Sequence, residues 1–69
     1  MSIYLKKFGK NVQQERLKQG ISQEKPGHLA KVHRTYIDMI ERAEKNITLL
    51  NMVKIANALG KKVSELIDF

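Results

Sequence analysis

The sequence predicts an all-α fold, a compact bundle of five short helices. Apolar residues recur at spacings of three and four along the chain and almost never alternate, which is the period of a helix and not that of a strand. Glycines and N-capping residues divide this pattern into short segments. A chain of 69 residues suits one small domain, so we expect residues 1–69 to form a single unit.

The first helix is predicted over residues 3–19. Leu5, Phe8 and Val12 form an apolar stripe with spacings of three and four, and Arg16 continues this stripe. Gly20 is expected to end the helix, because glycine adopts a positive φ without steric penalty.

The second helix is predicted to be short. Ser22 is a good N-cap for it, and the helix is expected to end near residue 30. Its inward positions are expected to be Pro26, Leu29 and Ala30.

A third helix is predicted to follow after only three or four residues. It is expected to begin at Val32 or His33 and to place Ile37, Ile40 and Glu41 on one face. Two short helices joined so tightly cannot easily lie antiparallel. They suit instead the steep crossing of a helix-turn-helix.

Two more helices complete the predicted bundle. Thr48 is a good N-cap for the fourth, and Gly60 is expected to close it. Its apolar stripe, the clearest in the chain, consists of Leu49, Met52, Val53, Ala56 and Leu59. A final helix is predicted over residues 64–69; its apolar positions are Val63, Leu66 and Ile67.

The composition excludes several kinds of site. Without Cys there is neither a disulfide nor a thiolate metal site, and two His without a carboxylate cluster are a poor metal set. We expect no cofactor and no enzyme activity, because no Ser or Cys nucleophile stands at a suitable spacing from either His. Apolar runs of two or three residues cannot span a membrane, and the first ten residues lack a signal-peptide core. We therefore expect a soluble cytoplasmic protein.

The charge balance predicts a polyanionic partner. The chain has 13 Lys and Arg against 7 Asp and Glu, a formal charge of +6, and residues 1–20 hold five basic residues against one acidic residue. Nucleic acid and an anionic membrane surface both suit this excess, although many ordinary domains are also basic. A membrane-active amphipathic peptide conflicts with Gly20 and Gly60, which break the chain into short helices.

The outer face of the third helix carries candidate contact residues. At about 100° per residue, Thr35, Met39 and Arg42 lie roughly opposite Ile37. Arg34 projects from the first turn, where recognition helices meet base edges in the major groove of DNA. The solvated side of an amphipathic helix would give the same pattern.

Arg16 and Glu41 each occupy an apolar stripe, four residues from Val12 and from Ile37 respectively. A charge at such a position is costly unless it meets an opposite charge, so we expect the first and third helices to cross with these side chains paired. The alternative is that both side chains extend to water.

Several segments of the chain resemble the helix-turn-helix family of phage Cro and C1 repressors. They are VQQERLKQG at 12–20, ISQEK at 21–25, LAKVHRTYI at 29–37, IERAEKNITLL at 40–50 and IANALG at 55–60. The RTYI, IER and NIT elements also resemble small stand-alone members that include controllers of restriction-modification systems. The resemblance implies the lambda-repressor-like DNA-binding fold, with the second and third helices as the helix-turn-helix and double-stranded DNA as the partner.

The resemblance also implies roles for single residues. Gln23 matches a position that contacts a phosphate and braces the recognition helix. Base-edge contacts are implied for Arg34, Thr35 and Met39. Backbone contacts are implied for His33, Tyr36, Arg42, Lys45 and Asn46. Arg16 and Glu41 match a buried ion pair of the family, in agreement with the argument from the apolar stripes.

Four residues depart from the family pattern. Pro26 stands in place of a core Leu, and it would remove the first intrahelical hydrogen bond of a helix capped by Ser22. We therefore expect that helix to begin later or to distort, and to be weakly stable. Lys31 and Ala43 each replace a usual Gly, and Ile47 replaces a usual Pro. A positive φ at Lys31 would cost roughly 1–2 kcal/mol.

The predicted function is that of a sequence-specific transcriptional regulator, a repressor or an activator, that binds a pseudo-palindromic operator as a homodimer. The candidate dimer surface consists of Val63, Leu66, Ile67 and Phe69. These side chains could equally close the core of the monomer. The alternative function is an antitoxin that binds a toxin protein and represses its own operon; RNA polymerase is a further candidate partner.

Overall fold

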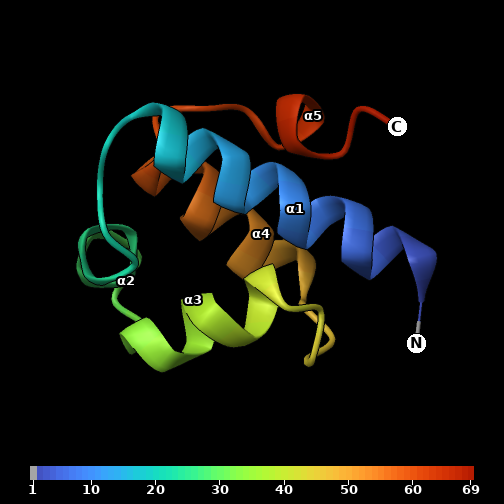
Figure 1. The fold of residues 1–69 in the computed structure, drawn as a ribbon, viewed down its shortest axis with the longest axis horizontal. Coiled ribbons are helices and arrows are strands. Elements are labelled where there is room, and N and C mark those ends of the chain that lie inside the picture. The colour runs from blue at the N-terminus through green and yellow to red at the C-terminus, as the bar shows by residue number, and fades with distance from the viewer. Residues whose placement is uncertain (1) are drawn as a thin grey trace.

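The computed structural model describes residues 2–69, which form five helices and no strand. The helices are α1 (Ile3–Lys18), α2 (Glu24–Ala30), α3 (Arg34–Glu41), α4 (Leu49–Ala58) and α5 (Val63–Leu66). Helix α1 crosses the molecule, with α3 and α5 on opposite sides of it (Figure 1). The all-α, five-helix prediction is confirmed. Along this described part of the chain, no helix combines the length and apolar character needed to cross a membrane.

Side-chain caps define the starts of three helices. Ser2 Oγ accepts a hydrogen bond from the Tyr4 N–H over 3.1 Å at the start of α1. His33 Nδ1 accepts from the Thr35 N–H over 3.1 Å, so α3 begins after His33 as predicted. Thr48 Oγ1 accepts from the backbone N–H of Asn51 over 3.1 Å, and the predicted cap of α4 is confirmed.

The predicted N-cap of the second helix, Ser22, is wrong. Helix α2 begins at Glu24, with Gln23 in the N-cap position. The first intrahelical hydrogen bond runs from the Gly27 N–H to the Gln23 carbonyl over 3.2 Å. Pro26 is therefore the third helical residue, where a backbone N–H would have no intrahelical acceptor. The later start removes the penalty of proline and allows its ring to be buried.

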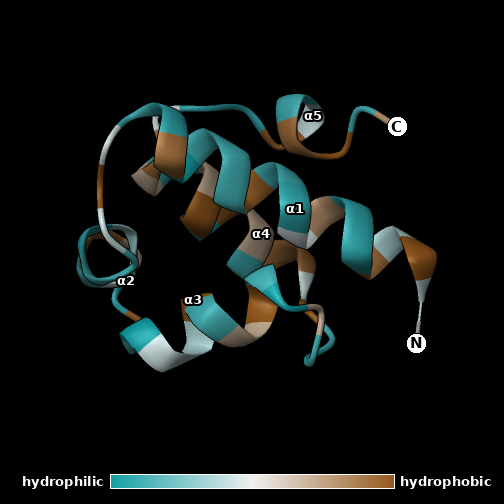
Figure 2. Ribbon diagram, viewed as in Figure 1, coloured by the Kyte–Doolittle hydropathy of each residue, from teal (hydrophilic) through white to brown (hydrophobic). Residues whose placement is uncertain are grey.

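One hydrophobic core lies between the helices. Its buried members are Phe8, Val12, Ala30, Ile37, Ile40, Ile55, Ala56, Leu59 and Leu66. Figure 2 shows hydrophobic segments of α4 in the middle of the molecule and hydrophilic ribbon at the start of α3.

Three predicted core positions are wrong. Leu29 is 53% exposed, Leu49 67% and Val53 37%. Ile55, which the predicted stripe omits, is fully buried. Because Ile55 sets the inward direction of α4, Val53 lies about 160° away on the helix and faces outward. Leu49 and Leu29 belong to parts of α4 and α2 that the neighbouring helices leave uncovered.

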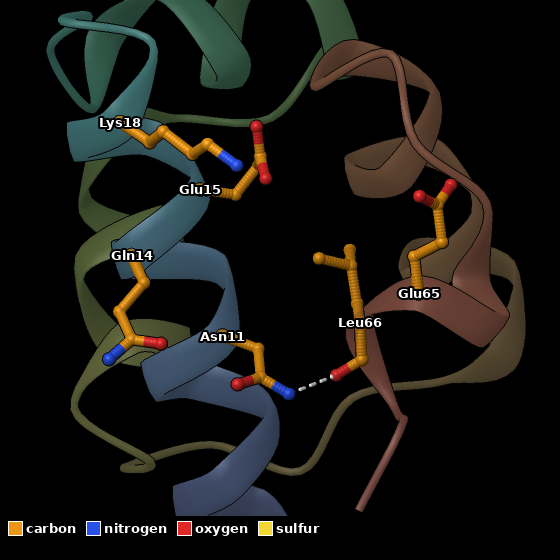
Figure 3. Close-up of a pocket in the computed structure, with 6 residues that line it drawn as sticks. All are labelled: Asn11, Gln14, Glu15, Lys18, Glu65 and Leu66. Atoms are coloured by element: carbon orange, nitrogen blue, oxygen red, sulfur yellow. Dashed lines mark hydrogen bonds between the residues drawn. The ribbon is translucent and has the colours of Figure 1, made fainter.

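The last helix is shorter than predicted. Helix α5 ends at Leu66, and residues 67–69 continue without helical structure. Asn11 Nδ2 on α1 donates to the Leu66 carbonyl over 2.8 Å, which ties the end of α5 to α1 (Figure 3). Beyond this point the Phe69 ring stacks on Tyr4 with a centroid separation of 6.1 Å. Contacts with α1 thus replace the expected final turn.

Candidate nucleic-acid interface

A left-handed residue makes the turn between α2 and α3. Lys31 has φ 59° and ψ 42°, and its N–H donates to the His28 carbonyl over 3.1 Å. Val32 N–H then donates to the Gly27 carbonyl over 2.8 Å. The positive φ expected at this position is present although the residue is Lys. The two helices are held close together, because a Cβ on Gly27 would lie 3.0 Å from the Val32 carbonyl oxygen.

A second left-handed residue follows α3. Ala43 has φ 58°, and the next residue, Glu44, donates its N–H to the Met39 carbonyl over 2.9 Å. The chain then leads to α4 through a loop in which Lys45 and Asn46 are exposed and Ile47 packs against the core. Both departures from the usual Gly therefore keep the backbone geometry that a glycine would adopt.

Arg16 on α1 and Glu41 on α3 form the predicted ion pair. Arg16 Nε lies 2.7 Å from Glu41 Oε2, and Nη2 donates to Oε1 over 3.1 Å. The side chains are only 11% and 1% exposed. Arg16 Nη1 also donates to the Ile21 carbonyl over 3.0 Å. The hydrogen bond to Glu41 raises the pKa of Arg16 above its usual value and so favours the charged form of the guanidinium.

Gln23 connects this pair to the start of α2. Its Nε2 donates to Glu41 Oε1 over 3.2 Å and to Asp38 Oδ1 over 3.1 Å. Residues of three helical segments therefore meet at one buried carboxylate. The contacts of Glu41 with Arg16 and Gln23 fix the orientation of α3 relative to α1 and to the start of α2. The bracing of α3 expected from Gln23 is present.

Asp38 is paired with neighbouring side chains. Besides the amide of Gln23, its Oδ2 contacts Arg42 Nη2 over 3.0 Å, and Arg42 also contacts Glu44 over 3.2 Å. These pairs with Arg42 are largely solvent-exposed and therefore weak. The acidic group on the outer face of α3 thus has two partners within the protein.

The first turn of α3 presents polar groups to solvent. Arg34 and Thr35 are exposed, and with Gln23 and Asp38 they line a shallow notch of about 200 Å³. Met39 was expected to face outward, but its side chain is half-buried and only part of it reaches the surface. The first turn of α3 contains no acidic residue.

The residues predicted to contact the DNA backbone lie at both ends of α3 and in the loop that follows it. His33 uses Nδ1 as the helix cap, which leaves Nε2 as the donor of the neutral imidazole. Tyr36 is half-buried, and its Oη accepts a hydrogen bond from Asn51 Nδ2 over 2.9 Å. Arg42, with Lys45 and Asn46 in the following loop, is exposed.

Two residues that position this surface were missed by the sequence analysis. A Cβ on Gly9 would collide with the Ile40 carbonyl oxygen and would lie 2.9 Å from the backbone carbonyl oxygen of Glu41, so Gly9 allows α1 to cross α3 at close range. A glycine inside a helical pattern is the signal that could have found it. Asn51 holds the Tyr36 hydroxyl, and no sequence pattern marks that contact.

A second polar notch lies between α1 and α5, on the side of α1 away from α3 (Figure 3). Lys18 lines it together with the carboxylates of Glu15 and Glu65. Lys61 Nζ lies 3.8 Å from Glu15 and 3.7 Å from Glu65. The Lys62 N–H, which donates to Glu65 Oε1, lowers the pKa of Glu65. The two carboxylates are thus paired with Lys61 within the protein.

A short helix with an exposed polar first turn, joined to a preceding helix by a left-handed residue, defines a helix-turn-helix DNA-binding domain. Residues 12–66 match the helix-turn-helix family model, and the chain belongs to this family of DNA-binding transcriptional regulators of the Cro/C1 type. The predicted resemblance is confirmed, and the chain is a regulator and not an enzyme.

Two similar sequences are control proteins. The chain is 48% identical to control protein C.BamHI of Bacillus amyloliquefaciens over 63 residues, which cover 90% of this chain and 78% of the relative. It is 38% identical to control protein C.SmaI of Serratia marcescens over 60 residues, 87% of this chain and 71% of the relative.

Two similar structures represent the same fold. The restriction-modification controller protein C.AhdI of Aeromonas hydrophila is 37% identical and superposes with a TM-score of 0.87, over 90% of this chain and 94% of that chain. The P22 c2 repressor, solved with a synthetic operator, is 25% identical with a TM-score of 0.79, over 87% of this chain and 91% of that chain.

Proposed function

We propose that this chain binds a pseudo-palindromic DNA site as a homodimer and controls transcription within a restriction-modification system. The observation that carries the proposal is the exposed first turn of α3, held rigidly by the buried contacts of Glu41 with Arg16 and Gln23. The similarity to the control proteins of Bacillus amyloliquefaciens and Serratia marcescens supports the biological setting.

Sequence preference is assigned to Arg34 and Thr35. The planar guanidinium of Arg34 can donate two hydrogen bonds to O6 and N7 of guanine, and the Thr35 methyl group suits the methyl group of thymine. Met39 adds apolar contact where its side chain reaches the surface. Asp38 is assigned no contact with a DNA base in this proposal, because Gln23 and Arg42 already bind its two carboxylate oxygens.

Affinity without sequence preference is assigned to the surrounding donors. In this proposal the phosphates are contacted by His33, Tyr36, Arg42, Lys45 and Asn46. The side chain of Gln23 braces α3 instead, because its Nε2 already donates both protons to Asp38 and Glu41. Lys45 and Arg42 contribute by displacing counterions, which makes binding sensitive to salt. Arg42 contacts Asp38 and Glu44 through Nη2 alone, so Nε and Nη1 are the groups that it offers to a phosphate.

An apolar groove between α1, α4 and the C-terminal residues supports a dimer. Tyr4, Leu5, Phe8, Ile47, Met52, Ile67 and Phe69 line this groove, which encloses about 280 Å³. Ile67 and Phe69 are 43% and 47% exposed, so they suit a dimer surface, whereas Leu66 is buried and Val63 half-buried against the monomer core. The prediction that Leu66 is an exposed dimer contact is therefore wrong. We assign the interface to Ile67, Phe69 and the groove beside them.

Selection from a randomised duplex library tests the proposal. The wild-type chain should enrich an inverted repeat whose half-sites lie about one helical turn, roughly 34 Å, apart. Sedimentation should give a dimer that Ile67→Lys dissociates, whereas the control Leu17→Lys, which changes an exposed apolar residue outside the groove, should not. Enrichment of no sequence would contradict the proposed function, and an unchanged Ile67→Lys dimer would contradict the assigned interface.

A further inference from the structure

Asn51, in the first turn of α4, holds the hydroxyl group of Tyr36 on α3. Its Nδ2 donates to Tyr36 Oη over 2.9 Å. The Tyr36 ring packs against the hydrophobic core, and the backbone N–H of Asn51 is bound by Thr48 Oγ1. Both ends of the hydrogen bond are therefore anchored, and the position of Oη is set by two helices.

This contact determines what the hydroxyl group can do. A tyrosine hydroxyl has one proton to donate as well as lone pairs that accept, whereas an amide nitrogen only donates. Because Asn51 donates, the proton of the Tyr36 hydroxyl is left for another partner. Along residues 2–69 this proton has no protein acceptor. A hydroxyl that accepts one hydrogen bond also donates a stronger one.

The first turn of α3, which contains Tyr36, suits an anion. Tyr36 follows the exposed residues Arg34 and Thr35, and the first turn of α3 has no acidic side chain. The N-terminal end of a helix carries partial positive charge, which favours phosphate oxygens. A phosphate beside this turn would find the Tyr36 proton unpaired and already oriented.

We infer that Asn51 is a positioning residue for DNA binding, which orients the Tyr36 hydroxyl to donate its proton to a DNA phosphate; the inference rests on the proposed function. Asn51 acts through Tyr36 and needs no contact with DNA itself. The same hydrogen bond joins α3 to α4. A phosphate bound by the Tyr36 hydroxyl therefore also fixes the orientation of α3 in the major groove of DNA.

A double-mutant cycle tests this inference on the duplex that the wild-type chain enriches from a randomised library. Asn51→Ala should weaken binding roughly three- to tenfold, the effect of losing one hydrogen bond. In a Tyr36→Phe background the same substitution should change the affinity less than about twofold, because the hydroxyl it positions is already absent. The control Asn57→Ala, at an exposed position of the same helix, should leave affinity unchanged.

A second measurement separates positioning from a general structural role. Each phosphate of the duplex is replaced in turn by an uncharged methylphosphonate. The wild-type chain should be sensitive at one phosphate in each half-site where Tyr36→Phe and Asn51→Ala are both insensitive. Thermal unfolding of each variant establishes that it is folded.

Two outcomes would overturn the inference in different ways. If Asn51→Ala weakens binding equally with and without the Tyr36 hydroxyl, Asn51 is not a positioning residue, while the proposed function stands. If the wild-type chain enriches no sequence, the proposed function fails and the inference fails with it.

Discussion

Arg16 and Glu41 join α1 to α3 through two parallel hydrogen bonds of 2.7 and 3.1 Å, and Glu41 is almost completely buried. Removal of one partner would leave the other as an unpaired charge in the interior. We therefore expect Glu41→Ala to lower the free energy of unfolding by about 3–5 kcal/mol, measured by urea denaturation.

Two comparisons show whether this loss arises from the unpaired charge. The double variant Arg16→Met with Glu41→Leu should recover most of the stability, because no charge remains to be desolvated. Glu44→Ala, which removes an exposed partner of Arg42, should change the free energy of unfolding by less than about 1 kcal/mol. Equal losses for Glu41→Ala and Glu44→Ala would contradict a buried pair.

Gly9 gives a prediction in which helix propensity and packing have opposite signs. Propensity alone would make Gly9→Ala stabilising by about 1 kcal/mol. The added Cβ, however, would collide with backbone oxygens of Ile40 and Glu41, which cannot move aside as a flexible side chain can. We expect a loss of about 1–3 kcal/mol in the free energy of unfolding. A gain in stability would show that α1 and α3 do not cross at this distance.

A feature of the site could be predicted from the sequence where the residues that cause it are visible in the pattern of a single helix or turn. The cap by Thr48 follows from neighbouring residues, and the pairing of Arg16 follows from a charge on an apolar stripe. The positive φ of Lys31 is suggested only by the family resemblance, in which a Gly usually stands at this position. The contact between Asn51 and Tyr36 depends on where α4 begins relative to α3, which the periodicity of either helix does not contain.

The errors at the predicted core positions of α4 have the same origin. Periodicity identifies an apolar face but not which part of it a neighbouring helix covers, so Leu49 and Val53 were predicted to be buried. At the start of α2 two local signals conflict. Serine is a good cap, but a helix capped by Ser22 would lose a hydrogen bond at Pro26. The later start expected from Pro26 is the one observed.

Lys31 gives a prediction about backbone strain. Its φ of 59° costs a residue with a Cβ roughly 1–2 kcal/mol. Lys31→Gly should therefore raise the free energy of unfolding by about 1 kcal/mol and slow amide exchange in α2. The control Lys54→Gly, inside α4, should instead lower it by about 1 kcal/mol. Destabilisation by both substitutions would mean that Lys31 is not strained.

Arg34 gives a prediction about sequence preference. Arg34→Ala should reduce discrimination among operator variants by about 1–3 kcal/mol, while binding to unrelated DNA changes little. Arg34→Lys keeps the charge but loses the planar pair of donors, so it should lose most of the same discrimination. Titrations of operator and scrambled duplexes measure both quantities. If Arg34→Ala weakens both equally, Arg34 contacts a phosphate and not a base.

Lys45 gives the complementary prediction, because its exposed ammonium lies in the loop after α3 and is assigned to a phosphate. Lys45→Ala should weaken binding to every duplex alike, and the slope of the logarithm of affinity against the logarithm of salt concentration should fall by about one. Lys18→Ala removes the same charge from the notch between α1 and α5, on the side of α1 away from α3 (Figure 1). Long-range attraction weakens within a Debye length of about 10 Å at 0.1 M salt, so the Lys18 variant should keep the wild-type slope. Equal slopes for the two variants would mean that the whole charge of the domain, and not the surface around α3, governs its affinity for DNA.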